Sequence, residues 1–332
     1  MKVRIRKTVA IILCICMCVT PLSIEAKTKK TSGKDGKNIT WNYDKQTKTL
    51  TFSGSGPISD FEMDGHSAEP GWYDWSEKAE HVVIEEGITV IGEMALYHFM
   101  NVKSVKLPET LTEIKCDAFE YNLELKNINL PESLKTIGEG AFELCRKLEI
   151  SEMPKNVKRI GEGAFENCQT IKKFTFPNNV RKIERRVMGD NRNLQDVRLS
   201  SNATRICGGA FYNCKKLKVL DIPKSVTRVA MSAFKGSGLK KIVLPENVKR
   251  IDNGNEDGRK VFKKRYGLLP TKNLRVIEIH SKKVKKIEKN SFGGLSRKVV
   301  IKVPKSVKKK YIKMLKKSGL SKKIRIKALK KK

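Results

Sequence analysis

The chain has 332 residues and a formal net charge of +35. Beyond residue 26 its cysteines are Cys116, Cys145, Cys168, Cys207 and Cys214, an odd number without a dense pairing pattern. This argues against a small fold stapled by disulfides, and the length is ample for a continuous hydrophobic core.

Residues 1–26 are predicted to be a secretory signal peptide. A basic head containing Lys2 and Arg6 precedes an apolar run from Val9 to Val19, and Ala26 offers a cleavage point. The apolar run is too short to span a bilayer. We therefore expect an exported protein that is secreted, extracellular or associated with the cell surface.

Residues 27–37 are expected to be a linker, and residues 38–80 an N-terminal β cap. Within the cap, Ile39–Trp41 and Thr49–Phe52 flank a polar segment, which predicts a hairpin.

Polar and aromatic side chains crowd together after the hairpin, at Asp60, Asp64, His66, Glu69, Asp74 and Trp75. Packing of the cap is one explanation for this cluster. A hydrolase site in the N-terminal cap is the alternative.

One pair of buried-type residues recurs every 23 residues through the middle of the chain. The copies are Ala95-Leu96, Ala118-Phe119, Ala141-Phe142, Ala164-Phe165, Val187-Met188, Ala210-Phe211 and Ala233-Phe234. A constant period of this length predicts a solenoid, in which each unit buries its apolar face against the next. A solenoid presents a long ordered surface, so we expect a binding protein.

The aligned units predict the same local structure in each coil. A short alternating strand such as Val105–Leu107 ends at a proline, which suits a strand end because it lacks an N–H. Two apolar positions follow, as at Leu111 and Ile114, and the Ala-Phe pair then returns the chain. Gly138 and Gly161 stand where a tight bend could require a positive φ. The fold class is a repeat solenoid over residues 81–303, mostly β with short turns and 3-10 segments.

A polar insertion at residues 252–260 interrupts the period. Asn253, Asn255 and Asp257 resemble the start of a calcium loop, but the twelfth position is Lys264, where a bidentate Glu is needed. A turn insertion is favoured over a calcium site.

Residues 304–332 are predicted to be a basic α/β C-terminal cap, with a helix over 306–318 and a short strand at Ile324 and Ile326. Residues 259–332 contain 29 Lys and Arg against Glu278 and Glu288, which places +27 of the charge in this part of the chain. The candidate contacts for a polyanion are Lys308, Lys309, Lys310, Lys313, Lys316, Lys317, Lys322 and Lys323. They predict either retention on a cell-wall polyanion or anionic lipid surface, or a solvated polar cap.

One complete unit of the template contains Leu130-Pro131, Leu134, Ile137-Gly138, Ala141-Phe142 and Leu148, and neighbouring units contain their counterparts. This pattern resembles the leucine-rich repeats of the BspA-like (Treponema-type) family of bacterial surface proteins. The resemblance implies a leucine-rich repeat solenoid with strands on one face, a surface location, and adhesion to host or bacterial proteins. Arg185–Met188 and Leu199-Ser200 depart from the pattern.

The outward residues of the predicted strands form the candidate face for a partner. They are Lys106, Asn129, Glu152, Thr175, Arg198 and Asp221, with Glu152 included if its unit keeps the register. A period of two points these residues away from the core. They are either solvated strand surface or the binding face of a repeat protein.

Chemistry other than binding has little support in the sequence. Cys145, Cys168 and Cys214 share one repeat position without a Cys-x-x-Cys set, so a small buried ladder residue explains them better than a metal or redox site. We expect no catalytic residue, metal or cofactor. We expect a monomer that binds an extracellular protein or glycan, and not nucleic acid, because the chain carries an export signal and no aromatic nucleic-acid motif.

Overall fold

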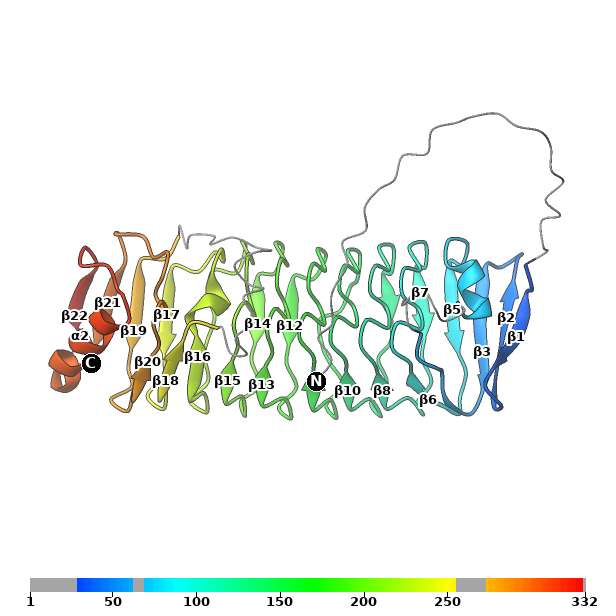
Figure 1. Cartoon of the computed structure of the whole chain (residues 1–332), viewed down its shortest axis with the longest axis horizontal. Coiled ribbons are helices and arrows are strands. Elements are labelled where there is room, and N and C mark those ends of the chain that lie inside the picture. Colours follow the sequence, from blue (N-terminus) through cyan, green and yellow to red (C-terminus); the bar gives the residue numbers. More distant parts are fainter. Residues whose placement is uncertain (1–28, 62–68, 255–272, 331–332) are drawn as a thin grey trace, which may run out of the picture. The chain divides into compact units, whose positions relative to one another are not determined.

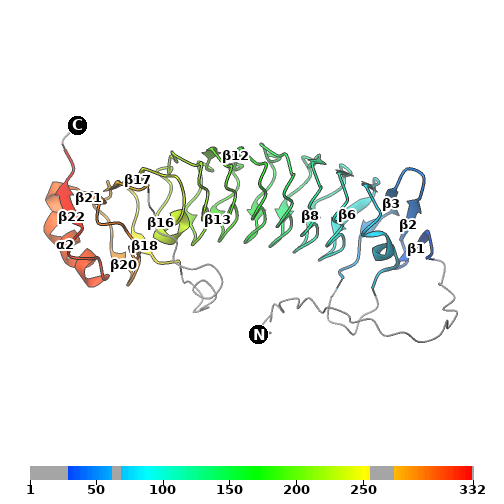
Figure 2. The same ribbon diagram turned by 90° about the horizontal axis from the view of Figure 1, so that it is seen from above.

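The computed structural model describes residues 29–61, 69–254 and 273–330. The predicted signal peptide at 1–26 and most of the insertion at 252–260 lie outside the described residues. Residues 31–332 belong to one unit. In it, successive coils stack through two ladders of short parallel strands (Figure 1 and Figure 2).

The N-terminal cap contains the predicted hairpin. β2 (Ile39–Asp44) pairs antiparallel with β3 (Thr49–Gly54), and Ile39, Trp41 and Tyr43 alternate into the core. β3 then pairs in parallel with β5 (His81–Ile84), while β4 (Gly56–Pro57) pairs with β6 (Ile88–Ile91). β3 thus connects the hairpin of the cap to the first coil.

The expected linker at 27–37 is wrong over part of its length, because β1 (Ser32–Asp35) pairs antiparallel with β2. A Cβ on Gly33 would lie 2.7 Å from Trp41 Nε1, so this strand needs glycine to pass the indole ring. The segment Ser-Gly-Lys-Asp has no apolar alternation, and its pattern could not predict a strand.

The first ladder contains the predicted proline-terminated strands. They are β5, β7 (Ser104–Lys106), β9 (Asn127–Ile128), β12 (Lys173–Thr175), β14 (Asp196–Arg198), β17 (Lys241–Leu244), β19 (Val276–Ile279), β21 (Val300–Val303) and β22 (Arg325–Ala328). Between β9 and β12 only Glu152 makes a bridge, to Thr175. Ser151 stands there where the next coil buries Phe174, so that coil lacks an apolar anchor for a strand.

The second ladder runs through the other side of each coil. Its strands are β6, β8 (Glu113–Ile114), β10 (Thr136–Ile137), β11 (Arg159–Ile160), β13 (Lys182–Ile183), β15 (Arg205–Ile206), β16 (Arg228–Ala230), β18 (Arg250–Asp252) and β20 (Lys286–Ile287). The family resemblance implied strands on one face, and the structure adds this second ladder of shorter strands. An alternation that lasts two or three residues is too short to be recognised as a strand in the sequence.

The returning segment holds the Ala-Phe pairs. The Phe119 N–H donates to the Ala141 carbonyl at 2.9 Å, and the Phe142 N–H donates to the Ala164 carbonyl at 2.9 Å. The rings of Phe119, Phe142 and Phe165 stack with centroids 5.3 Å apart. Each buried Phe contributes roughly 1.5–3 kcal/mol, and only stacked coils realise that gain.

Gly138 and Gly161 are needed for close approach, and the expected positive φ is wrong. A Cβ on Gly138 would lie 2.4 Å from the Lys115 carbonyl carbon, and one on Gly161 2.5 Å from the Glu139 nitrogen. The left-handed conformation falls two residues later, at Gly140 (φ 63°) and Gly163 (φ 65°).

The irregular segment Arg185–Met188 keeps the coil intact. Val187 and Met188 are buried in the places of Ala and Phe. Arg186 takes a positive φ of 52° and donates to Glu166 and to Asp190 Oδ2, the latter at 3.0 Å. A buried ion pair therefore occupies the position that glycine holds in neighbouring coils.

The C-terminal cap is α/β, as predicted. After β21, a 3-10 turn η3 (Lys305–Val307) leads into α2 (Lys308–Lys317), and β22 then pairs in parallel with β21. Two further 3-10 turns, η1 (Gly71–Trp75) and η2 (Met231–Phe234), replace the usual turns in their coils. Among the described residues, no helix is both long and apolar enough to cross a membrane.

Candidate functional site

We call the six predicted face residues the strand-face row. Lys106, Thr175 and Arg198 lie on strands of the first ladder, and Glu152 makes a bridge to it. Asn129 and Asp221 hold the corresponding positions in coils where no strand covers them. Lys106, Asn129, Glu152, Arg198 and Asp221 are exposed, and Thr175 is half-buried. Thr175 is in register with Glu152 on one side and with Arg198 on the other. The row therefore keeps its register from Glu152 to Arg198, so Glu152 belongs to it.

The same row continues beyond the predicted residues at both ends. Lys106 is in register with Val83, while Val243, Glu278, Lys302 and Lys327 continue the row at the C-terminal end. Sequence reasoning missed Glu278, Lys302 and Lys327 because the insertion before them breaks the 23-residue count. The proline that ends each strand was the signal that could have restored it, as at Pro304 after β21.

Three basic side chains surround Glu278 on this surface. Its carboxylate accepts from Lys241 Nζ at 2.9 Å, Lys302 Nζ at 3.0 Å and His280 Nε2 at 3.2 Å. Burial alone raises the pKa of Glu278, but the three hydrogen bonds outweigh it and lower that pKa to about 2. Glu278 thus stays ionised and organises the cations around it.

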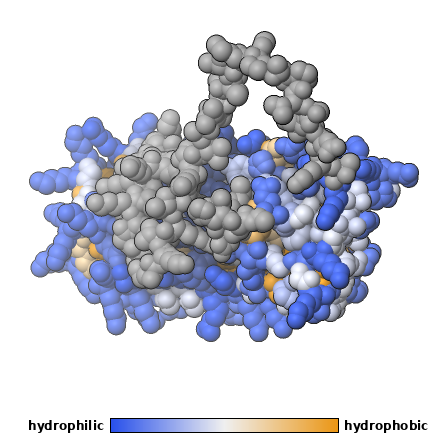
Figure 3. All heavy atoms as spheres, turned by 45° about the vertical axis from the view of Figure 1, so that its right-hand side comes forward, coloured by the Kyte–Doolittle hydropathy of each residue, from blue (hydrophilic) through white to orange (hydrophobic). Residues whose placement is uncertain are grey.

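A second outward row lies two residues earlier in each strand of the first ladder. It contains His81, Ser104, Asn127, Lys173 and Asp196, and His81 Nδ1 lies 2.7 Å from Ser104 Oγ. Val219, at the same place in its coil, is 69 % exposed. The two rows together make a polar surface of mixed sign. Figure 3 shows a face that is mainly hydrophilic, with small hydrophobic areas.

The predicted polyanion contacts lie on and beside α2. Tyr311 and Leu315 are buried, so the helical period places Lys309, Lys310, Lys313, Lys316 and Lys317 together on the opposite, exposed side. Lys308 is half-buried at the margin of that side, and Lys322 and Lys323 are exposed in the turn before β22. The structure thus brings five of the eight lysines onto one helix face.

Two of the crowded residues of the N-terminal cap, Trp75 and Asp60, make structural contacts. Trp75 stacks on Tyr43 with centroids 4.2 Å apart, and Trp72 Nε1 donates to the Ala95 carbonyl at 2.9 Å. Asp60 Oδ1 accepts from the Glu93 N–H at 2.7 Å and from Lys115 Nζ at 3.0 Å. Asp64 and His66 lie outside the described residues.

The repeat-position cysteines form a buried ladder of free thiols. Cys145 Sγ donates to the Phe119 carbonyl and Cys168 Sγ to the Phe142 carbonyl, each at 3.2 Å. Asn191 takes the same place in its coil and donates to the Phe165 carbonyl at 2.7 Å. Burial raises the pKa of both thiols, so they remain protonated donors to the backbone.

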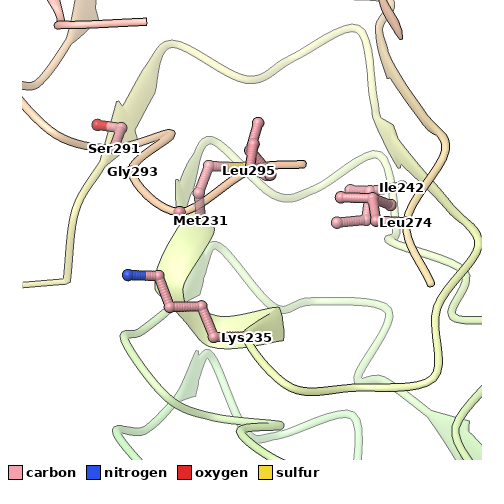
Figure 4. Close-up of a pocket in the computed structure, with 8 residues that line it drawn as sticks. Met231, Lys235, Ile242, Leu274, Ser291, Gly293 and Leu295 are labelled. Atoms are coloured by element: carbon pink, nitrogen blue, oxygen red, sulfur yellow. The ribbon is translucent and has the colours of Figure 1, made fainter. Parts of the chain in front are cut away.

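A small cavity lies between η2 and the loop that contains Ser291 and Leu295 (Figure 4). Met231, Ile242 and Leu274 line it, and its volume is 10 Å³, about the space that one water molecule needs. Burial lowers the pKa of Lys235 at its edge. The cavity is too small for an organic ligand.

Comparisons with known proteins agree with this architecture. Residues 69–191 and 147–255 match the family model described as the BspA type leucine-rich repeat region, which has 6 copies of the repeat. The two matches together span more than half of the chain. No curated protein is significantly similar in sequence.

Two solved structures of bacterial leucine-rich repeat proteins resemble this one. A protein from Bacteroides ovatus has a TM-score of 0.60 at 21% identity, over 88% of this chain and 76% of its own. A protein from Eubacterium ventriosum has a TM-score of 0.52 at 19% identity, over 82% of this chain and 77% of its own. At such identities the likeness establishes a shared fold.

Proposed function

The chain belongs to the BspA-type leucine-rich repeat family, and from this membership we propose that it is an exported protein that binds an extracellular protein or glycan through the strand-face row. The observation that carries the proposal is the row itself. The ladder holds Lys106, Thr175 and Arg198 in register, and these outward side chains lie outside the apolar core that stacks the coils, so their identities are free to suit a partner. Binding, and not catalysis, is the role that such a surface supports.

Reversing charge along the row tests this function. The variant Lys106→Glu, Arg198→Glu, Asp221→Lys should lower partner capture about ten-fold, because like charges then face a complementary surface. Capture from host extracellular matrix and from bacterial envelope fractions is quantified by mass spectrometry. The matched control, Glu109→Lys, Arg192→Glu, Lys215→Glu, makes the same change of net charge on exposed turns. Equal capture by both variants and the parent protein would remove the row from the function.

Retention on an anionic surface is a second candidate function, favoured by the lysine face of α2. Tyr311 and Leu315 anchor the helix, so the five lysines can approach a surface without unfolding the cap. Each Lys near an anionic membrane contributes about 1 kcal/mol, and salt screens it.

Neutralising the lysine face of α2 should release the protein from an anionic membrane or cell wall. We expect Lys309→Gln, Lys313→Gln, Lys316→Gln, Lys317→Gln to lower binding to phosphatidylserine-containing vesicles and to cell walls at least ten-fold, as raising the salt does. Co-sedimentation measures both. Binding that ignores the substitutions and the salt contradicts this function and leaves the strand-face proposal untouched.

A further inference from the structure

The outward side of the second ladder carries a run of one charge sign. We call this run the cation ladder. Its members are Lys135, Lys158, Arg159, Arg181, Lys182, Arg205, Arg228, Lys249, Arg250, Lys285 and Lys286. They occupy two adjacent outward positions in successive coils, all exposed or half-buried. In Figure 1 the ladder follows strands β10, β13, β15, β16, β18 and β20.

Strand pairing aligns these cations. Lys182, Arg205, Arg228, Arg250 and Lys286 are consecutive register partners from β13 to β20. Arg159 precedes Lys182 by one 23-residue period, in the neighbouring coil. Parallel strands lie ~4.8 Å apart, so the ladder offers a cation at each such step.

The uniformly positive charge of the cation ladder does not simply follow from the basic composition of the chain. Over the same coils the strand-face row mixes Glu152, Arg198, Asp221 and Glu278. In the cation ladder the remaining outward residues are Thr136, Thr204 and Thr227. No acidic or apolar side chain interrupts it between Lys135 and Arg250.

In the described structure, the carboxylates that pair with ladder cations stand along one margin, two residues after a cation. Lys182 pairs with Glu184 at 2.8 Å, Arg228 with Asp252 at 2.5 Å, and Arg250 with Glu288. Within the described parts of the chain, Lys135, Lys158, Arg159 and Arg181 form no ion pair. The N-terminal half of the ladder is therefore open to an external anion.

We propose that the cation ladder binds a linear acidic polysaccharide, laid across the coils. A repeating carboxylate or sulfate matches the repeating cations, and guanidinium groups bind such anions through two parallel hydrogen bonds. Thr204 Oγ1 donates to the Arg181 carbonyl at 3.1 Å and Thr227 Oγ1 to the Thr204 carbonyl at 3.3 Å. Each hydroxyl oxygen can still accept a hydrogen bond from a sugar hydroxyl.

Other polyanions fit this surface less well. Single-stranded nucleic acid binds by stacking on aromatic side chains, and protein interfaces depend on buried apolar or aromatic anchors. The ladder contains neither, since its outward residues are Lys, Arg and Thr throughout. Length selectivity follows from the geometry, because Lys135 to Lys286 spans seven coils and roughly 29 Å at ~4.8 Å per step.

The test uses the full mature chain and heparin oligosaccharides of graded length as probes. Affinity for heparin should rise with fragment length up to a span of roughly 30 Å and then level off. The variant Lys135→Gln, Lys158→Gln, Arg159→Gln, Arg181→Gln should lose at least ten-fold in affinity and show a shallower dependence on salt. These side chains make no ion pair in the described structure, so the fold should survive, as circular dichroism would verify.

Two controls separate the cation ladder from general charge. The α2 variant of the preceding section removes the same number of charges and should bind heparin within about two-fold of the parent protein. Glu184→Gln should raise affinity two- to three-fold, because it frees Lys182. Equal losses in the ladder and α2 variants, length-independent binding, or tighter binding to oligo(dT) or polyglutamate than to heparin would overturn the proposal. None of these outcomes bears on capture by the strand-face row.

Discussion

At the scale of single residues, Glu278 shows how one carboxylate is kept charged on a sheet rich in cations. It is only 9 % exposed and accepts hydrogen bonds from Lys241, Lys302 and His280. A buried charge without partners is strongly destabilising, whereas a fully hydrogen-bonded one is tolerated. In the returning segment, the buried charge of Arg186 is likewise compensated by ion pairs with Glu166 and Asp190.

Glu278 should make stability depend on acid pH. Its pKa in the folded protein is about 2, against 4.5 in the unfolded chain, so its contribution is present above pH 4.5 and is lost as the pH falls toward 2. Glu278→Gln should lower the free energy of unfolding at pH 7 by roughly 1–2 kcal/mol, since water at the sheet surface screens part of the interaction. The difference from the parent protein should shrink at pH 2.

Urea titrations at several pH values measure this dependence. Glu109→Gln is the matched control, because Glu109 is exposed and has no ion pair in the described structure. A difference between the Glu278→Gln variant and the parent protein that stays constant from pH 7 to pH 2 would contradict the assignment.

At the scale of elements, α2 is a helix that its own ends do not stabilise. Val307 provides no side-chain cap, and Lys308, Lys309 and Lys310 stand in the first turn, where the helix dipole disfavours positive charge. Packing of α2 against the last coils must compensate for the missing cap and for the unfavourable charges. Tyr311 is fully buried, and its hydroxyl donates to the Ser281 carbonyl at 2.9 Å and accepts from the Val284 N–H at 3.0 Å.

Tyr311→Phe should therefore loosen α2 from the last coils. It leaves two buried backbone groups without partners, which costs about 1–3 kcal/mol. Hydrogen exchange at the Val284 amide should accelerate, together with the amides of α2. Tyr121→Phe serves as the control, since the Tyr121 hydroxyl makes no hydrogen bond in the described structure. Unchanged exchange at Val284 would show that the hydroxyl does not anchor the helix.

At the scale of the whole molecule, the backbone pairings of the two ladders join each coil to its neighbours. Every pairing after the N-terminal hairpin joins one coil to the next. Stability then depends on the number of intact interfaces between coils, and complete units can be gained or lost without changing the fold.

Deleting one complete coil should leave a folded protein. Removal of residues 116–138 joins Lys115 to Glu139. Glu139 holds the same position in its coil as Cys116 does one period earlier, so the repeat stays in phase. We expect an unchanged circular dichroism spectrum per residue and a lower midpoint of thermal unfolding. Removal of residues 116–127 deletes half a coil, shifts the buried positions, and should abolish cooperative unfolding. Similar behaviour of the two deletions would argue against nearest-neighbour stacking.

Residues of the candidate surfaces could be predicted from the sequence only where the 23-residue period and the strand pattern could both be recognised. Lys106 to Asp221 could be assigned because the strand pattern and proline recur every 23 residues. Glu278 and Lys302 could not, because the insertion changes the count. Arg159, Lys182, Arg205 and Arg228 also recur at 23 residues, but no strand was expected there, so nothing indicated on which side they lie.

The sequence by itself determined the repeat, the buried positions and both caps, because stacking demands the same apolar residues at the same place in each coil. Only the tertiary structure decided where the charges gather. Neighbouring coils bring residues 23 apart to within a strand spacing, and the second ladder turns these cations outward. Each coil contributes only one or two cations there, and the surface arises when the coils are stacked.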